Sequence, residues 1–397
     1  MINKLPYDIL PSGGVASLNW TPDQQAYAFR RRAEIDPVRK IGNGRNASPM
    51  PIALHQISPR WTWKGESMDV DCYLKQERVS GVIVLKDGHV LLERYGLGRT
   101  AEDLWDTQSV TKSIAGILVG AAIQDGYIEG VGEAVTKYIP ELKGSAYDDV
   151  TIRQLLTMTS GVKWVEDYTD DAKSDDSKMF MPATAPMVNG VDPVVRYMRR
   201  LSRATNPGAT FQYKGGDSEL AAKLVSNAVG MSLSEYLSIK IWKPFGMDRS
   251  AYWMVNPAGQ EYGSTGISMT LRDYARIGQF MLGGGKVGGV QVLPWEWLAD
   301  ATSAQEAFSV ATESGATGYG YYWWIGKDFF MANGYAGQRI VVYPEDKTVI
   351  AVNSAWEQPN RPEHSPALTA FIEALHAAAV THTPSLARIE PNRGGQR

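Results

Sequence analysis

Ser109 and Lys112 stand three positions apart at the start of an apolar run that extends to Ile123. On a helix this spacing puts both side chains on one face, so the hydroxyl and the amine can touch. A serine hydroxyl becomes a strong nucleophile when a neighbouring base takes its proton. Lysine can be that base if burial or nearby positive charge lowers its pKa towards neutrality. Free backbone N–H groups at a helix start also favour an oxyanion. The pair therefore predicts a serine hydrolase with Ser109 as nucleophile.

The same spacing recurs at Ser160 and Lys163. About one or two such pairs are expected by chance in a chain of ordinary composition. Gly161 is typical of the end of a helix, and no apolar helix follows it. Ser160 and Lys163 should therefore not share a helical face, and a structural role is predicted for Ser160. By its local context alone, Ser109 could still be only a helix cap.

Composition limits the other classes of function. The 397 residues are 44% hydrophobic, and the formal net charge of −3 has no long run of either sign. Nucleic acid and anionic membrane are therefore not expected as partners. The single cysteine, Cys72, excludes an internal disulfide, and five scattered histidines form no metal-ligand pair. No apolar stretch is long enough for a signal peptide or a membrane span, so a cytoplasmic location is expected.

The pattern of elements predicts an α+β fold, with strands at both ends and helices between them. Two β-rich runs joined by Asp87-Gly88 indicate a hairpin over 81–95. The helix that carries Ser109 should end near Gly126. Further helices are expected at 151–159, 194–201, 218–229, 234–242, 271–282, 294–301 and 367–380, and strands at 320–325, 329–332, 338–343 and 348–354.

The predicted organisation is a discontinuous sheet domain with a helical insertion. Residues 66–135 and 262–382 should form the sheet domain, and 136–261 the mainly helical domain. Residues 1–65 are expected to be an irregular arm that docks through its aromatic side chains. Residues 383–397 should be a flexible tail. The acidic stretch within 160–190 reads as an exposed loop over a cleft.

Several stretches resemble the serine β-lactamase and penicillin-binding-protein superfamily, in its class C, esterase-like branch. The chain most resembles 6-aminohexanoate-dimer (nylon oligomer) hydrolases and family VIII carboxylesterases. The match runs in order from about residue 80 to 355, and the resemblance implies a β-lactamase/transpeptidase-like fold. The stretches are Asp106-Thr-Gln-Ser-Val-Thr-Lys112, Leu155-Leu-Thr-Met-Thr-Ser-Gly161, Pro207-Gly-Ala-Thr-Phe-Gln-Tyr213, Lys243-Pro-Phe-Gly-Met247 and Ser268-Met-Thr-Leu-Arg-Asp-Tyr-Ala-Arg276.

The resemblance implies a third proton-handling group, Tyr213. It begins the family's second motif, Tyr-x-Asn, which here reads Tyr213-Lys214-Gly215, so that glycine replaces the asparagine. A phenol beside a lysine ammonium can have a lowered pKa, so that it can receive a proton and then return it to a leaving group. The resemblance thus implies a catalytic set of Ser109, Lys112 and Tyr213.

The family's third motif, Lys-Thr-Gly or His-Thr-Gly, is best matched by Ala332-Asn-Gly334. This register makes Tyr335 N–H the second oxyanion donor, beside Ser109 N–H. A rival register over Ala336-Gly337 would give that role to Gln338. The missing basic residue at 332 argues against strong β-lactamase or D,D-peptidase activity. The resemblance therefore implies hydrolysis of small esters or linear amides.

Two other functions remain as alternatives: a β-lactamase or D,D-peptidase, and an inactive binding member of the fold. No metal or organic cofactor is expected. The resemblance implies a homodimer, and it suggests Tyr168, Trp324, Gly334 and Gln338 as substrate-binding residues. Tyr168 either binds an amide leaving group or belongs to a solvated loop, and Trp324 either lines the acyl pocket or packs in the core.

Overall fold

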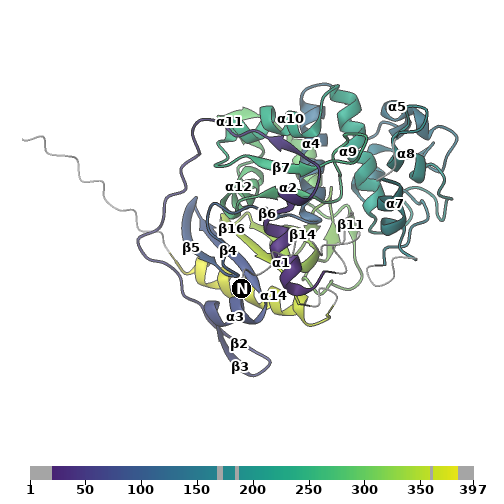
Figure 1. Cartoon of the computed structure of the whole chain (residues 1–397). Coiled ribbons are helices and arrows are strands. Elements are labelled where there is room, and N and C mark those ends of the chain that lie inside the picture. The colour runs from purple at the N-terminus through teal and green to yellow at the C-terminus, as the bar shows by residue number, and fades with distance from the viewer. Residues whose placement is uncertain (1–19, 168–172, 184–186, 358–360, 383–397) are drawn as a thin grey trace, which may run out of the picture.

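An eight-stranded antiparallel sheet forms the centre of the molecule, as Figure 1 shows. The computed structural model describes residues 20–167, 173–183, 187–357 and 361–382. The strand order is β11-β12-β13-β14-β15-β16-β4-β5, so strands from the two ends of the chain meet where β16 pairs with β4. The strands are β4 (Val79–Lys86), β5 (His89–Tyr95), β11 (Glu306–Ala307), β12 (Gly318–Tyr319), β13 (Trp324–Ile325), β14 (Phe330–Gly334), β15 (Gln338–Tyr343) and β16 (Thr348–Ser354).

The Asp87-Gly88 hairpin is confirmed. Lys86 pairs with His89, which leaves a two-residue turn between β4 and β5. Both turn residues have positive φ, 48° at Asp87 and 79° at Gly88. Such a turn matches the twist of the two strands, which is why Asp-Gly is favoured there.

Helices cover both faces of the large sheet. On one face, α12 (Leu271–Leu282) packs on β4, β15 and β16, and α4 (Val110–Gln124) packs on β14 and β15. On the other face lie α3 (Val70–Gln76) and α14 (His364–Val380). Nearly every residue of α4 is buried, which agrees with its all-round apolar sequence. The nucleophile candidate therefore stands at the head of a helix in the core of the molecule.

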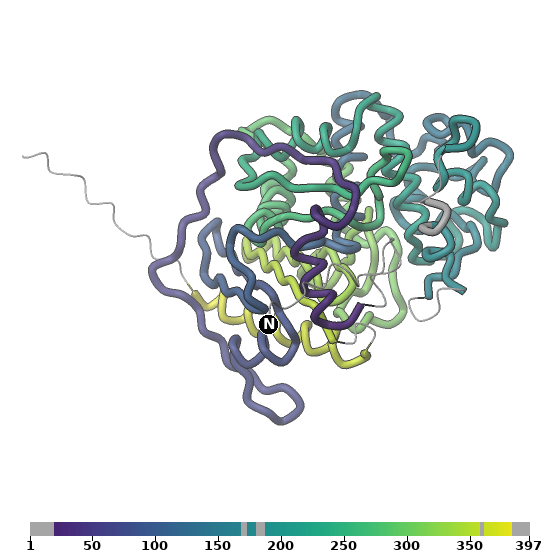
Figure 2. The backbone as a smooth tube through the Cα atoms, in the orientation of Figure 1, coloured from purple at the N-terminus to yellow at the C-terminus, as the bar shows by residue number. Residues whose placement is uncertain are grey.

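The helical part of the chain lies beside this sheet and is drawn in teal in Figure 2. The acidic stretch predicted to be a loop contains a helix, α7. An acidic first turn, Asp175 and Asp176, favours the start of this helix. The helical part of the chain consists of α5 (Val135–Tyr138), α6 (Ile152–Leu156), α7 (Asp175–Ala183), α8 (Pro193–Met198), α9 (Gly215–Val229), α10 (Leu233–Leu237), a π-helical turn (Ser238–Trp242) and α11 (Lys243–Phe245). Helix α13 (Trp295–Ala301) follows later in the chain.

The prediction of an irregular arm over 1–65 is wrong for the part that the structure describes. Residues 20–65 contain α1 (Pro22–Arg30), α2 (Arg32–Ile35), β1 (Val38–Ile41) and β2 (Arg60–Trp63), which pairs with β3 (Glu66–Asp69). Helix α1 starts with a capping box in which Thr21 and Gln24 bond each other's backbone. This local signal was available in the sequence.

The arm also joins a second, four-stranded sheet of order β1-β7-β8-β6. Its other strands are β6 (Trp105–Asp106), β7 (Ala251–Met254) and β8 (Ile267–Met269). The expected domain boundary at 261/262 runs through this sheet, between β7 and β8. Because β6 leads directly to Ser109, the small sheet connects the arm to the nucleophile candidate.

The described part of the chain is an α+β structure, as predicted. None of its helices is long and apolar enough to cross a membrane. Among the same residues, no group of three or more His, Cys, Asp or Glu side chains is placed to hold a metal ion. The predicted tail, 383–397, lies outside the described residues.

Candidate active site

Ser109 is held by a short turn between β6 and α4. Gln108, just before it, has a left-handed backbone with φ of 48°, which is strained for a residue other than glycine. The buried carboxylate of Asp106 stabilises this turn by accepting hydrogen bonds from Gln108 N and Gln108 Nε2, both at 3.0 Å. Arg32 of α2 lies 3.4 Å from the same carboxylate. The arm thus helps to fix the position of the nucleophile candidate.

Lys112 makes three contacts at the head of α4. Its Nζ donates to Ser109 Oγ at 3.1 Å and to the carbonyl oxygen of Ser264 at 3.1 Å. It also lies over the Tyr213 ring, 5.0 Å from the ring centre. An ammonium group has three donors, so these contacts fit a protonated lysine. The structure brings Tyr213 to Ser109 and Lys112, about a hundred positions away in the sequence.

The pKa of Lys112 does not shift in the direction that a simple lysine base requires. Burial does lower the pKa of Lys112, as expected, but Tyr213, Glu166 and Asp176 raise it by more, so the net shift is upward. Lys112 therefore rests as an ammonium ion and cannot take the Ser109 proton unless it passes one on. The condition for a simple lysine base, a pKa lowered towards neutrality, is therefore not met, and the local sequence could not show which groups fold against the amine.

Asp176 occupies the place of the missing asparagine side chain. Any side chain at Gly215 would collide with Asp176 Oδ1, so the glycine and the α7 carboxylate fit each other. Glu166 accepts hydrogen bonds from Gly215 N at 3.4 Å and from the Trp164 indole. Removal from water and the charge of Glu166 raise the pKa of Asp176 well above its usual value, against the effect of Lys112. The sequence reading missed Asp176, because only folding brings α7 to residue 215.

Glu219 positions the carbonyl that Lys112 contacts. Its carboxylate accepts from Ser264 Oγ at 2.5 Å, from Ser264 N at 2.9 Å and from Gly263 N at 2.9 Å. Glu219 lies on α9, the helix that begins directly after Tyr213 and Lys214. Nothing in the local pattern marked Glu219, since its partners are more than forty positions away in the chain.

Glu219 should make stability depend on pH. Removal from water raises the pKa of Glu219 from its ordinary value of 4.5 to about 7. Folding therefore takes up a proton at Glu219 between these pH values, so the contribution of Glu219 to the free energy of unfolding is largest at low pH and is lost as pH rises through about 7. The contribution is on the order of 3 kcal/mol. Urea unfolding of wild type and Glu219→Gln at about pH 5 and about pH 8 measures it.

The Gln variant should lose less stability than wild type between these two pH values. The other buried carboxyl groups are present in both proteins, so the difference between the two slopes isolates Glu219. Equal slopes would contradict the assignment.

The third-motif segment lies against the nucleophile. A side chain at Gly334 would meet the carbonyl oxygen of Thr107 at 2.8 Å and Ser109 N at 3.2 Å, so only glycine allows this approach. Tyr335 and Ala336 follow in a tight turn, in which Ala336 has a φ of 57°. Ser109, Gly334 and Tyr335 all line one cavity of about 340 Å³. The backbone of 334–335 is therefore beside the head of α4.

Gln338, the rival candidate, has a side chain that points away from the cavity at Ser109. Its side chain is fully buried. Gln338 Oε1 accepts from the Trp105 indole at 3.0 Å, and Nε2 donates to the carbonyl oxygens of Tyr335 at 3.0 Å and Ser354 at 2.7 Å. These contacts tie the β14–β15 turn to β6, so Gln338 supports the segment beside Ser109 from behind.

Trp324 lies at the cavity and not wholly in the core. It lines the cavity with Tyr213, and the two rings stack with centres 5.7 Å apart. Its neighbour Trp323 is fully buried. Tyr168, the other predicted substrate contact, lies outside the described residues.

Ser160 has a different partner from the one its spacing suggested. It is fully buried, while Lys163 is exposed. Ser160 Oγ instead accepts from Lys214 Nζ at 3.1 Å, and Lys214 also donates to the carbonyl oxygen of Val162 at 2.8 Å. Neither Ser160 nor Lys214 lines the cavity at Ser109. The structural role predicted for Ser160 agrees with this geometry.

Comparison with known proteins gives one family match. Residues 69–374 match the model of the family described as Beta-lactamase. A curated relative, the 6-aminohexanoate-dimer hydrolase of Paenarthrobacter ureafaciens, is 29% identical over 348 residues, which cover 84% of this chain and 86% of the relative.

Solved structures share the fold. A Bacillus anthracis protein provisionally assigned as a 6-aminohexanoate-dimer hydrolase has a TM-score of 0.75 at 23% identity, covering 89% of this chain and 94% of the other. EstCE1, described as a hydrolase with promiscuous acyltransferase activity, has a TM-score of 0.57 at 13% identity, covering 77% and 95%. At these identities the likeness concerns the fold, and it agrees with the β-lactamase/transpeptidase-like architecture predicted from the motifs.

Proposed function

Because the chain belongs to the beta-lactamase family of hydrolases, we propose that it cleaves small esters or linear amides through an acyl-enzyme on Ser109. The observation that carries the proposal is the contact of one buried ammonium group, Lys112, with both Ser109 and Tyr213 at the wall of a cavity. A nucleophile, a proton relay and a space for substrate are the parts that acyl transfer needs.

The first step is attack by Ser109 on the substrate carbonyl. Lys112 rests as an ammonium, so it passes a proton to Tyr213 while it receives the proton of Ser109. In this relay Tyr213 is the final acceptor, so the proton of Ser109 leaves Oγ as a proton arrives at the tyrosine oxygen. The bond from Ser109 Oγ to the carbonyl carbon forms as that proton leaves, and Lys112 ends the step protonated, as it began.

The tetrahedral intermediate carries an oxyanion. The N–H groups of Ser109 and Tyr335 are the proposed donors, since the segment at Gly334 lies against Ser109 N. Tyr213 then gives its proton to the leaving alcohol or amine, which departs as the carbonyl re-forms. Water attacks the acyl-enzyme by the same relay and releases the acid. No step of this sequence calls for a metal or an organic cofactor.

The substrate class follows from what surrounds the cavity. The third motif has Ala332 where the family has a basic residue, and Gly215 with Asp176 replaces the asparagine of the second motif. The usual groups for holding a β-lactam are therefore changed, which favours open esters and linear amides. The name of the Paenarthrobacter relative, a 6-aminohexanoate-dimer hydrolase, supports the choice of linear amides.

An assay panel tests the substrate class. p-Nitrophenyl butyrate, a linear 6-aminohexanoate dimer and the chromogenic cephalosporin nitrocefin are incubated with the full chain at equal enzyme concentration. The ester, the linear amide or both should be hydrolysed, and nitrocefin much more slowly. Turnover of nitrocefin at a rate that matches the ester would favour the β-lactamase alternative. No turnover of any of the three, with no labelling by a fluorophosphonate, would favour the inactive binding member.

A further inference from the structure

Arg339 on β15 is a buried cation without an acidic partner. Its side chain is only 1% exposed. The guanidinium donates to Asn333 Oδ1 at 3.0 Å, to Thr369 Oγ1 at 3.2 Å and to Ser365 Oγ at 2.8 Å. All three acceptors are neutral, and no ion pair within the described residues involves Arg339. Buried charges are normally paired, because removing a charge from water costs free energy.

The other buried arginines have interactions that compensate for the removal of their charge from water. Arg32 pairs with Asp36 and Asp106, and Arg276 pairs with Asp273. Arg99 has no ion pair among the described residues, but its guanidinium lies over the Trp105 ring, 5.3 Å from the ring centre. Burial lowers the pKa of Arg339 to about 10, so it stays charged at neutral pH. Arg339 therefore carries a positive charge that no described carboxylate balances.

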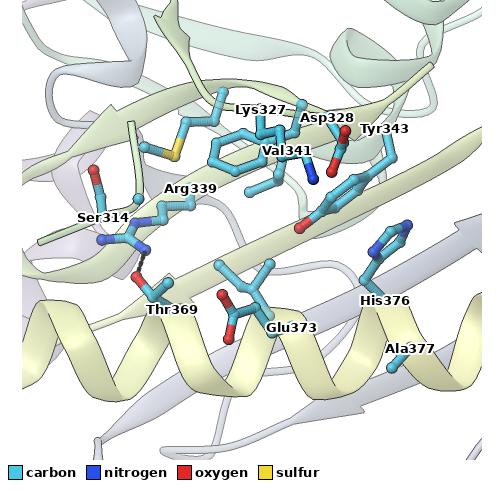
Figure 3. Close-up of a pocket in the computed structure, with 14 residues that line it drawn as sticks. Ser314, Lys327, Asp328, Arg339, Val341, Tyr343, Thr369, Glu373, His376 and Ala377 are labelled. Atoms are coloured by element: carbon cyan, nitrogen blue, oxygen red, sulfur yellow. Dashed lines mark hydrogen bonds between the residues drawn. The ribbon is translucent and has the colours of Figure 1, made fainter. Parts of the chain in front are cut away.

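Arg339 also lines two cavities, and Arg99 lines neither of them. It lines the cavity that contains Ser109, together with Asn333, Ser365 and Trp356. It lines a second cavity of about 340 Å³ on the α14 side of the sheet, which Figure 3 shows. In that view Arg339 points to Thr369, and Glu373 on the same helix makes no ion pair with it. The arginine thus lies where the two cavities adjoin.

Arg339 is within reach of a substrate bound at Ser109. Gly334, which lies against Ser109 N, pairs with Gln338, and the next rung of the same ladder pairs Asn333 with Arg339. Neighbouring strands lie about 4.8 Å apart and residues along a strand about 3.4 Å apart. A short substrate chain can therefore extend from Ser109 past Asn333 to Arg339. A guanidinium has five N–H donors, so one donor on each terminal nitrogen remains for a planar, bidentate ligand.

We propose that Arg339 binds a carboxylate carried by the substrate, so that the preferred substrates are anionic esters or amides. This inference rests on the proposed hydrolase function and narrows it. The chain lacks the basic residue of the third motif at Ala332, and Arg339 supplies positive charge from the neighbouring strand instead. Arg339 acts as a specificity-determining residue, since its distance from Ser109 keeps it from the reacting atoms.

Two matched pairs of esters test the proposal and distinguish the position of the carboxylate. The 4-nitrophenyl monoester of glutaric acid and its neutral methyl diester place the charge on the acyl side. The butyrate ester of 4-hydroxybenzoic acid and that of its methyl ester place the charge on the leaving group. Wild type should prefer the anionic member of one pair by roughly 10- to 100-fold in kcat/KM, mainly through KM. Arg339→Gln should remove this preference, and Arg339→Lys should restore part of it.

Arg99→Gln is the matched control. It removes an equally buried guanidinium that lies away from both cavities, so a general loss of stability appears in both variants. Only Arg339→Gln should change the preference for charge. Equal rates on both members of both pairs in wild type, or a preference that survives Arg339→Gln, would overturn the proposal.

A binding measurement separates this inference from the proposed function. In the Ser109→Ala background, glutarate should raise the melting temperature of the protein with Arg339 and not of the protein with Arg339→Gln. If wild type hydrolyses none of the esters but glutarate binds in this way, the proposed function fails and the carboxylate site stands. If the esters are hydrolysed and glutarate shows no such difference, the carboxylate site fails alone.

Discussion

Ser109→Ala should abolish hydrolysis of p-nitrophenyl butyrate, with kcat reduced on the order of 10³-fold or more. The hydroxyl is the only part of the proposed machinery that forms a bond to the substrate, so its removal closes the acyl-enzyme route altogether. The cavity and the backbone donors remain in the variant, and the substrate should still bind. Steady-state kinetics and labelling by a fluorophosphonate, with the modified peptide mapped by mass spectrometry, measure both consequences.

Ser160→Ala is the matched control, because Ser160 also contacts a lysine through its hydroxyl. It is buried against Lys214, away from the cavity at Ser109. Its replacement should leave most of the activity and the fluorophosphonate label in place. Activity that persists in Ser109→Ala, or a label that maps to Ser160, would refute the nucleophile assignment.

Lys112→Met and Tyr213→Phe should each lower kcat on the order of 10²-fold or more, because both side chains move the same proton. If the two residues form one relay, the double variant should be no slower than the slower single variant. Lys112→Arg should also be slow, since arginine keeps the positive charge but does not release a proton near neutral pH. Steady-state kinetics on the four variants decide between a relay and two independent effects.

Tyr319→Phe is the control for the tyrosine. Tyr319 belongs to the same aromatic cluster, with its ring 6.5 Å from that of Tyr213 and 5.0 Å from that of Trp324. Phenylalanine keeps the ring contacts in both positions and removes only a hydroxyl. A loss of rate in Tyr319→Phe equal to that of Tyr213→Phe would show that removing either hydroxyl of this cluster lowers the rate, and it would contradict a specific role of Tyr213 in proton transfer.

The sequence was most informative where a signal is local. The Asp87-Gly88 turn needs only the two conformations that these residues favour, and it appears as predicted. The helix that follows Ser109 is apolar on every side, which only a core helix can be. The spacing of Ser109 and Lys112 likewise places their contact within one turn of chain, so the hydrogen bond between them could be expected.

Predictions from local sequence were wrong for segments whose composition suggested irregular structure but which contain short helices and strands. The Pro- and Gly-rich start of the chain suggested an irregular arm, yet β1 finds its partner in β7, more than two hundred positions away. The acidic stretch looked like a solvated loop, but α7 brings Asp176 against Gly215. In both cases the stabilising partner is distant in sequence, and no pattern within the segment reveals it.

The sequence by itself predicted the contact of Ser109 with Lys112, the α+β class and, by its motifs, Tyr213 as the third member of the proposed site. Only the tertiary structure decided the charge on Lys112, because that depends on Glu166, Asp176 and Tyr213 meeting the buried amine. Only the tertiary structure separated Gln338, which is buried behind the hairpin, from Arg339, which reaches the cavity from the adjacent position. Burial and long-range electrostatics are properties of the assembled fold. The type and spacing of residues predict contacts only between side chains that lie within a few helical turns of each other in the sequence.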